Sequence, residues 1–178
     1  MKILWAVCSL FLCLFSGCGY TTRSQIGEVY RTIYVAPFEN RVNFTKETYT
    51  HDKHRIYRPG LETDITSAVV NKFLFDGNLR PVAEEKARLL LKGALVEFRK
   101  DPIRRTDSDD VSEFRVNVVV DLTLSEAGAD SELWREGRFT GDTTYFTTGA
   151  QAVPESTAIS AAIDDLARRI VERCVEDW

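Results

Sequence analysis

The chain has 178 residues, of which 44% are hydrophobic and 28% are charged, and its formal net charge is −4. Disordered chains lack this apolar content and multi-span membrane proteins lack this share of charge, so the composition excludes both classes. The mild acidity argues against nucleic-acid binding, which needs a clustered basic face. At this length one domain with a single core is expected.

The first eighteen residues have the pattern of an export signal. Lys2 supplies a positive charge, and residues 3–15 form an apolar run that is shorter than the about 20 residues needed to span a bilayer. Ser16, Gly17 and Cys18 follow, and this end is similar to the lipobox of bacterial lipoproteins. The resemblance implies cleavage after residue 17 and a covalent diacylglycerol and N-acyl lipid on Cys18. A plain secretory signal or an uncleaved anchor is the alternative.

The residue after the lipobox cysteine bears on the destination. Gly19 stands where an Asp would retain a bacterial lipoprotein in the inner membrane, so the resemblance implies the outer membrane. We therefore expect a signal peptide at 1–17, a lipidated cysteine and flexible tether at 18–28, and one domain at 29–178.

The four cysteines do not form a disulfide framework. Cys8 and Cys13 lie in the signal, and Cys18 is the expected lipid attachment site, so Cys174 alone is left in the domain. Cys174 falls on the apolar stripe of a predicted helix, which favours a buried free thiol that packs as a small hydrophobe.

The first half of the domain predicts a strand and then a helix. Residues 32–36 are rich in β-forming residues and are followed by Pro37, which ends a strand. Residues 39–58 are polar and predict a long loop, and residues 79–82 predict a short strand. Between them, apolar residues at helical spacing predict a helix from Pro59 to about Gly77: Leu61, Ile65, Val69 and Phe73.

The second half predicts three long strands and a final helix. Residues 88–98 are apolar at both parities, as in a strand covered on much of both faces, and residues 100–110 predict a loop. Residues 113–124 alternate apolar and polar with Val119 as the exception, which indicates a strand with one wet face. A turn at 127–130 leads to a strand at 132–146, and a helix begins after Pro154.

These elements define the expected fold class. It is an α+β domain with a single-layer mixed or antiparallel sheet of about four strands and two helices packed on one face, in the order β-α-β-β-β-α.

No motif in the chain indicates catalysis, and no cofactor is expected. His51 and His54 have no further His or Cys nearby to complete a metal site, and a solvated loop explains them better. The acidic run Asp107, Asp109 and Asp110 lacks the central Gly and terminal Glu of a calcium loop. Asp164 and Asp165 are adjacent and point apart on a helix. We therefore expect that the protein is not an enzyme.

One basic group stands out, namely Arg99, Lys100, Arg104 and Arg105 near the predicted hairpin end. Guanidinium groups bind phosphate bidentately, so this group is a candidate contact for the phosphates of an anionic lipid. The alternative is a solvated hairpin tip, with its charges balanced by nearby aspartates.

Six short segments carry a family resemblance: the lipobox and following tyrosine (18–20), the strand and corner at 33–40, the helix start at 60–68, the strand at 87–93, Val120-Asp121-Leu122, and Leu133-Trp134. Together they resemble the LptE family, the outer-membrane lipoproteins of lipopolysaccharide transport, with Arg88 in place of that family's usual Asp. The resemblance implies a lipid-anchored domain on the periplasmic side or inside the lumen of an LptD-type β-barrel. It would assist that barrel's assembly and contact lipopolysaccharide, without catalysis.

Two other classes of protein share some of these features. The strand and corner are also similar to those of periplasmic lipoproteins of the curli-secretion CsgG type and of peptidoglycan-associated modules. A secretion-pore or envelope-scaffold lipoprotein would share the tether and the sheet, but should self-assemble into rings. A lipid-anchored hydrolase would need a pocket with an activated nucleophile or acid pair.

Overall fold

The computed structural model describes residues 30–42, 59–107, 110–129 and 131–176. Cys18, the tether, His51 and His54 lie outside the described residues. The elements in chain order are β1 (Thr32–Val35), β2 (Glu39–Asn40), α3 (Leu61–Asp76), β3 (Arg80–Pro81), the 3-10 helix η1 (Glu84–Lys86), β4 (Leu89–Arg105), β5 (Val111–Glu126), β6 (Glu132–Phe146) and α4 (Glu155–Glu176).

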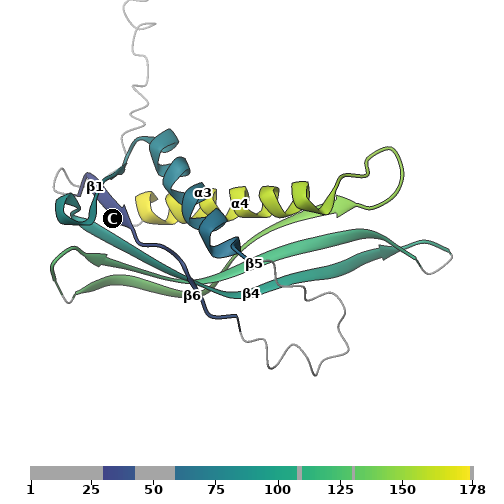
Figure 1. The fold of residues 1–178 in the computed structure, drawn as a ribbon, viewed down its shortest axis with the longest axis horizontal. Helices are drawn as coiled ribbons and strands as arrows, with labels where there is room; N and C mark the ends of the chain where they lie inside the picture. The colour runs from purple at the N-terminus through teal and green to yellow at the C-terminus, as the bar shows by residue number, and fades with distance from the viewer. Residues whose placement is uncertain (1–29, 43–58, 108–109, 130, 177–178) are drawn as a thin grey trace, which may run out of the picture.

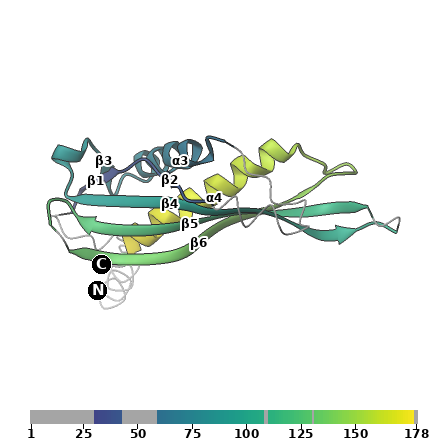
Figure 2. The ribbon, with the colours of Figure 1, turned by 60° about the horizontal axis from the view of Figure 1, so that its bottom comes forward.

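The strands form one mixed sheet in the order β3-β1-β4-β5-β6, and β2 also pairs with β4. The strands β1 and β2 run parallel to β4, whereas β4, β5 and β6 form a long antiparallel meander. Both helices lie on one face of the sheet (Figures 1 and 2). The predicted α+β class is confirmed. The described residues form six strands rather than about four. The short strand predicted at 79–82 is present as β3, whereas β2 is two residues long, too short to show periodicity, and falls in the predicted loop at 39–58.

The core lies between the helices and this face of the sheet. The predicted stripe of α3 is fully buried, and in β5 the predicted apolar parity, from Phe114 to Leu124, faces the helices. Cys174 is buried on α4 as expected. These helices form because each places one apolar stripe against the sheet, where burial contributes roughly 25 cal/mol per Å².

The strand β4 corrects one expectation and contains a bulge. It extends to Arg105, so most of the predicted loop at 100–110 is a hairpin arm. Pro102 is tolerated there because, among the described residues, no strand pairs with the outer edge of β4 at that point. A register shift between Leu95 and Glu97 places Leu95 and Phe98 on the same face, opposite Val120 and Val118. The bulge therefore brings Phe98 to the buried face. Before the bulge, Leu95 and Ala94 are both buried although their parities differ, as expected of a strand covered on much of both faces.

Glycines permit two close approaches in the core. A Cβ at Gly141 of β6 would lie 2.4 Å from the Cβ of Leu166, so α4 packs directly on the strand backbone. A Cβ at Gly93 of β4 would lie 2.1 Å from the ring of Phe38, which follows β1 and covers the strand there. Glycine is required at both positions because a side chain would not fit there, and not because the backbone adopts an unusual conformation.

Candidate functional site

A ladder of hydrogen bonds crosses the sheet face that the helices leave open. Arg99 donates to Asp101 at 2.6 Å and to Glu97 at 2.9 Å, and Arg138 of β6 donates to the other oxygen of Glu97 at 2.5 Å. The amide of Asn117 on β5 donates to Asp101 at 2.8 Å. We call Glu97, Arg99, Asp101, Asn117 and Arg138 the charged ladder. It joins the three long strands through paired charges and presents a polar surface.

The ladder is held in its charged state. Burial alone would raise the pKa of Glu97, but the hydrogen bonds from Arg138 and Arg99 outweigh it and lower that pKa. The hydrogen bond to Asp101 raises the pKa of Arg99. Asn117 is only 6% exposed, although alternation assigned it to the wet face. The sequence does not indicate this burial, because the side chains that cover Asn117 are distant in sequence.

Lys100 lies on the opposite face of the sheet from Arg99. Its ammonium is 2.7 Å from the carboxylate of Glu155, the first residue of α4, and 4.7 Å from the ring centroid of Phe114. The hydroxyl of Tyr145 donates to the same Glu155 oxygen at 3.1 Å. The hydrogen bond from Lys100 lowers the pKa of Glu155, whereas burial and the Glu155 charge raise the pKa of Tyr145 to about 12. Lys100 is thus engaged between the sheet and α4.

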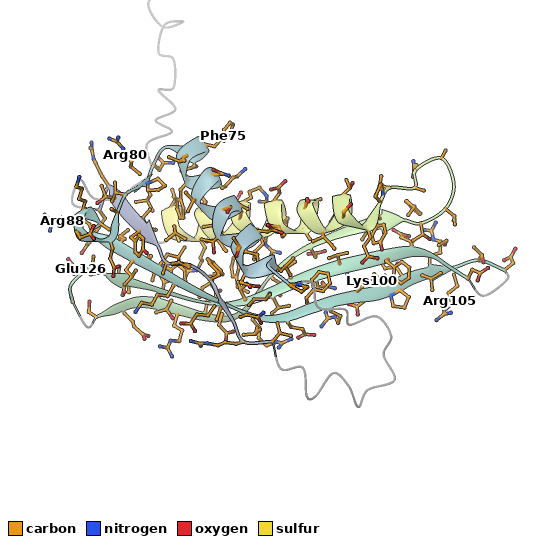
Figure 3. All side chains as sticks on the ribbon, in the orientation of Figure 1. Phe75, Arg80, Arg88, Lys100, Arg105 and Glu126 are labelled. Atoms are coloured by element: carbon orange, nitrogen blue, oxygen red, sulfur yellow. The ribbon has the colours of Figure 1, made fainter. Side chains whose placement is uncertain are left out.

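The four basic candidates therefore do not form one cluster. Arg99 belongs to the charged ladder and Lys100 points toward the helices. Arg104 is 66% exposed in its side chain, 3.7 Å from Glu113, and Arg105 is exposed near the hairpin tip. Figure 3 shows Lys100 and Arg105 at the end of the molecule away from Phe75, Arg80 and Arg88. Of the four, Arg104 and Arg105 face solvent near the tip of the hairpin.

A wide groove of about 910 Å³ lies on the open face at the other end of the sheet. Its floor comes from β4 and β5, and its rims come from the corner after β1 and from the hairpin between β5 and β6. Charged side chains of both signs line it, including Glu39, Arg41, Lys92, Asp121 and Arg135. Such a polar, open lining suits contact with another macromolecule rather than enclosure of a small substrate.

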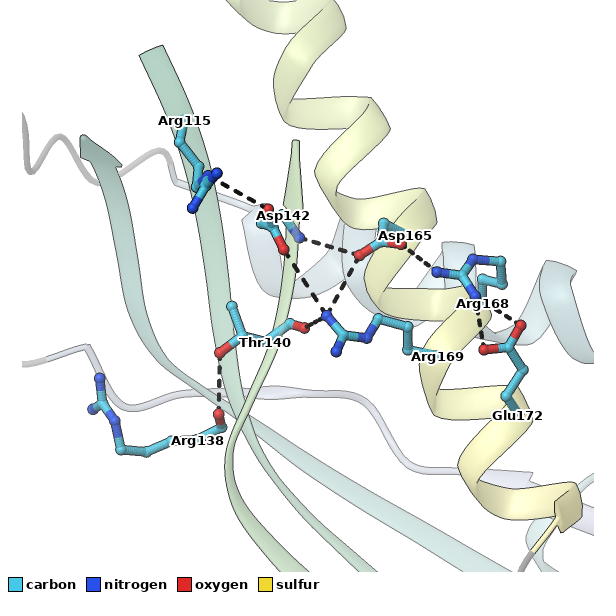
Figure 4. Close-up of polar contacts among 8 residues, drawn as sticks. All are labelled: Arg115, Arg138, Thr140, Asp142, Asp165, Arg168, Arg169 and Glu172. Carbon is cyan, nitrogen blue, oxygen red and sulfur yellow. Dashed lines mark hydrogen bonds and ion pairs between the residues drawn. The ribbon is translucent and has the colours of Figure 1, made fainter. Parts of the chain in front are cut away.

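Side chains of α4 cap the outer edge of β6 (Figure 4). The carboxylate of Asp165 accepts a hydrogen bond from the backbone N–H of Asp142 at 3.2 Å, and Arg169 donates to the carbonyl of Thr140 at 2.6 Å. Arg168 binds Asp165 and holds it in place at 2.6 Å. These contacts satisfy backbone groups that an edge strand would otherwise offer to another strand.

The remaining candidates from the sequence show no chemistry in the described part of the chain. Asp107 is exposed, Asp109 lies outside the described residues, and the described residues contain no cluster of three or more potential metal ligands. Asp164 is exposed while Asp165 binds arginines. Burial raises the pKa of Cys174 to about 12, so its thiol is not nucleophilic near neutral pH. No described helix has the length and apolar character to cross a membrane.

The fold and its surfaces define a two-layer α+β domain with polar faces that suit macromolecular contacts. The LptE family model, described as lipopolysaccharide-assembly, matches residues 30–175. The chain therefore belongs to the LptE family. Among proteins with curated functions, none matches the sequence.

Solved structures share the fold at low identity. A hypothetical protein from Chlamydia trachomatis has a TM-score of 0.50 and 9% identity, covering 82% of this chain and 95% of that one. A protein from Xanthomonas campestris has a TM-score of 0.50 and 13% identity, covering 87% and 85%. An uncharacterized lipoprotein B from Nitrosomonas europaea has a TM-score of 0.50 and 15% identity, covering 82% and 83%. These similarities establish the fold and nothing further about function.

Proposed function

We propose that this protein is an outer-membrane lipoprotein, anchored through Cys18, that acts as plug and assembly partner of an LptD-type β-barrel in lipopolysaccharide transport. It binds lipopolysaccharide without making or breaking bonds. The observation that carries the proposal is the match of the lipopolysaccharide-assembly family over residues 30–175, which runs from before β1 to the last turn of α4.

The physical character of the sheet supports a plug. The lumen of a large outer-membrane barrel is polar, so a domain inside it needs a polar surface with its charges paired. The charged ladder supplies such a surface on the open face. The hairpin of β4 and β5 extends beyond the helices and gives the domain an elongated shape (Figure 2). An elongated domain fits a lumen better than a round one of the same volume.

Affinity purification from solubilised outer membrane tests the partner. We expect a large β-barrel protein to co-purify with the tagged wild-type chain. The double variant Glu97→Lys and Arg138→Glu exchanges two charges of the ladder and should weaken recovery, whereas Arg168→Gln on the exposed side of α4 should not. Recovery of a homo-oligomer without a barrel would instead support the secretion-pore or scaffold alternative.

Lipid attachment is tested separately. The Cys18→Ala variant should accumulate as an unprocessed precursor without lipid label, because the thiol is the proposed acceptor. Unchanged processing and labelling would show that Cys18 is not the anchor.

Among Arg99, Lys100, Arg104 and Arg105, the tip arginines offer the cleaner test of lipopolysaccharide contact. Arg104→Glu with Arg105→Glu should weaken lipopolysaccharide binding about tenfold, because charge-assisted hydrogen bonds to phosphate would be lost. Lys86→Glu, on the exposed 3-10 helix η1 and outside both the tip and the groove, is the control and should leave the affinity unchanged. Equal affinities of all three proteins would remove the tip from the proposal while leaving the plug role open to the purification test.

A further inference from the structure

The two edges of the long antiparallel meander differ in how the rest of the domain covers them. At the β6 edge, side chains of α4 bind two backbone groups of the strand (Figure 4). At the β4 edge, the N–H of Arg41 donates to the carbonyl of Leu95 at 2.8 Å, where β2 ends its pairing. Within the described residues, no strand pairs with the outer side of β4 between Leu95 and Arg105. An uncovered edge offers its backbone N–H and C=O groups to another strand.

The register of β4 shows which of its backbone groups point away from β5. These groups alternate between the two sides of a strand, and Leu95 directs its carbonyl outward to Arg41. The bulge that follows Leu95 adds one residue, so the outward set continues with Phe98, Lys100 and Pro102. Pro102 fits this set because it has no N–H to offer to β5. The outward donors of this stretch are therefore the N–H groups of Phe98 and Lys100.

The charged side chains beside this edge retain polar atoms that the ladder does not use. Arg99 donates from Nε to Asp101 and from Nη1 to Glu97. Asp101 accepts from both Arg99 and Asn117 on the same oxygen, Oδ2. Within the described residues, Nη2 of Arg99 and Oδ1 of Asp101 make no hydrogen bond. An incoming strand with an acidic residue opposite Arg99 and a basic residue opposite Asp101 would pair with both.

A second copy of this chain does not fit the edge with its charges matched. Antiparallel pairing that sets Arg99 opposite Asp101 of the second copy also brings the hairpin end of that copy, near Arg105, against Leu95. That place is taken, because Arg41 already bonds to Leu95 there. The neighbouring registers set Arg99 or Asp101 opposite its own counterpart, which places like charges together. A segment of a different chain has neither problem.

We infer that the outer edge of β4, from Phe98 to Pro102, pairs with an extended segment of the proposed barrel partner. The N–H groups of Phe98 and Lys100 donate to carbonyls of this segment, and Arg99 and Asp101 bind side chains of opposite charge on it. The plug role surrounds this sheet with a second polypeptide, and of the two edges of the meander only this one is left uncovered by the described residues. The inference rests on the proposed function.

Amide hydrogen exchange of the full acylated chain tests whether the edge is open. The N–H of Lys100 should exchange at least about tenfold faster than that of Arg99, which faces β5. In the complex with the barrel, exchange at Lys100 should slow, while Arg99 stays as it is. Slow exchange at both positions in the free chain would overturn the inference, because another part of the chain then covers the edge. Slowing that depends on protein concentration would overturn it in favour of a second copy.

Two substitutions at Lys100 isolate the backbone contact. Lys100→Pro removes the outward N–H, Lys100→Ala keeps it, and both lose the ion pair with Glu155. Proline should be tolerated there as it is at Pro102, so urea unfolding should give both variants similar free energies. Affinity purification should recover about fivefold less barrel with Lys100→Pro than with Lys100→Ala, as for one lost hydrogen bond. Equal recovery by two equally stable variants would overturn the inference.

The inference and the proposed function fail in different ways. If the wild-type chain recovers no barrel, the plug role is wrong and the edge loses its occupant with it. If the wild-type chain recovers the barrel but exchange at Lys100 does not slow in the complex, the plug role stands and the edge inference is wrong. The exchange measurement needs no substitution, so it decides the matter even where Lys100→Pro fails to fold.

Discussion

The ammonium of Lys100 lies 2.7 Å from the carboxylate of Glu155, and this contact ties the arm of the long hairpin to the first turn of α4. The Lys100 side chain is 15% exposed and that of Glu155 is 41% exposed, so water screens the pair only in part. A carboxylate in the first turn is also stabilised by the helix dipole. The pair therefore fixes where α4 begins relative to the sheet.

Glu155→Gln should lower the free energy of unfolding by about 1 kcal/mol at neutral pH, because it removes this ion pair and weakens the acceptor of Tyr145. Urea unfolding measures the change. Glu85→Gln on η1, which is exposed, should change the value by less than about 0.5 kcal/mol.

The same pair predicts a dependence on acid. The pKa of Glu155 is lowered in the folded state from 4.5, so its stabilisation is present above pH 4.5 and is lost as pH falls through the folded pKa. The wild type should lose more stability than Glu155→Gln between neutral pH and this acid range. If the free energies of unfolding of the two proteins change in parallel with pH, the contact does not contribute to the pH dependence of stability.

The burial of Cys174 predicts how the free energy of unfolding changes at alkaline pH. Its pKa is raised from 9.0 to about 12, so the buried neutral thiol contributes stability that is complete below pH 9 and is lost as pH rises toward 12. Cys174→Ala should cost about 1 kcal/mol at pH 7 through the small cavity it leaves. Its unfolding free energy should then fall less steeply than that of the wild type between pH 9 and 11. An unchanged slope would contradict the burial of the thiol.

Gly141→Ala should destabilise the domain by about 2–3 kcal/mol, because the new Cβ would lie 2.4 Å from Leu166 and force α4 away from β6. Gly137→Ala in the same strand is the control. Its new Cβ would meet only Asp121 Oδ1 at 3.7 Å, so its cost should stay below about 1 kcal/mol. Thermal unfolding of both variants compares them directly, and equal shifts would show that α4 does not pack directly on the strand.

Asp165→Ala with Arg169→Ala should increase self-association, since it uncovers the N–H of Asp142 and the carbonyl of Thr140 on an edge strand. Sedimentation velocity at increasing protein concentration measures it. Asp164→Ala, on the exposed side of α4, should stay as monodisperse as the wild type. Association of both variants to the same extent would assign the effect to lost surface charge instead.

The periodicity of single elements could be predicted from the sequence, because it depends only on which side chains need burial. Both helices, the alternation from Phe114 to Leu124 and the burial of Cys174 follow from spacing along one element. The two-residue strand β2 and the bulge after Leu95 could not be predicted, since they depend on partners far away in the chain. The extension of β4 through Pro102 likewise depends on its pairing with β5.

For the surfaces, the sequence by itself predicted an export signal and a lipid site at Cys18, and it carried the resemblance to the LptE family. Only the tertiary structure decided that Arg99 and Lys100 point to opposite faces, because the alternation of a strand separates neighbours in sequence. It also decided that Arg31, Arg80 and Arg88 lie at one corner of the sheet, since parallel pairing of β1 with β3 and β4 brings three separate segments together. Patterns within one element follow from local geometry, whereas a surface follows from which elements pair.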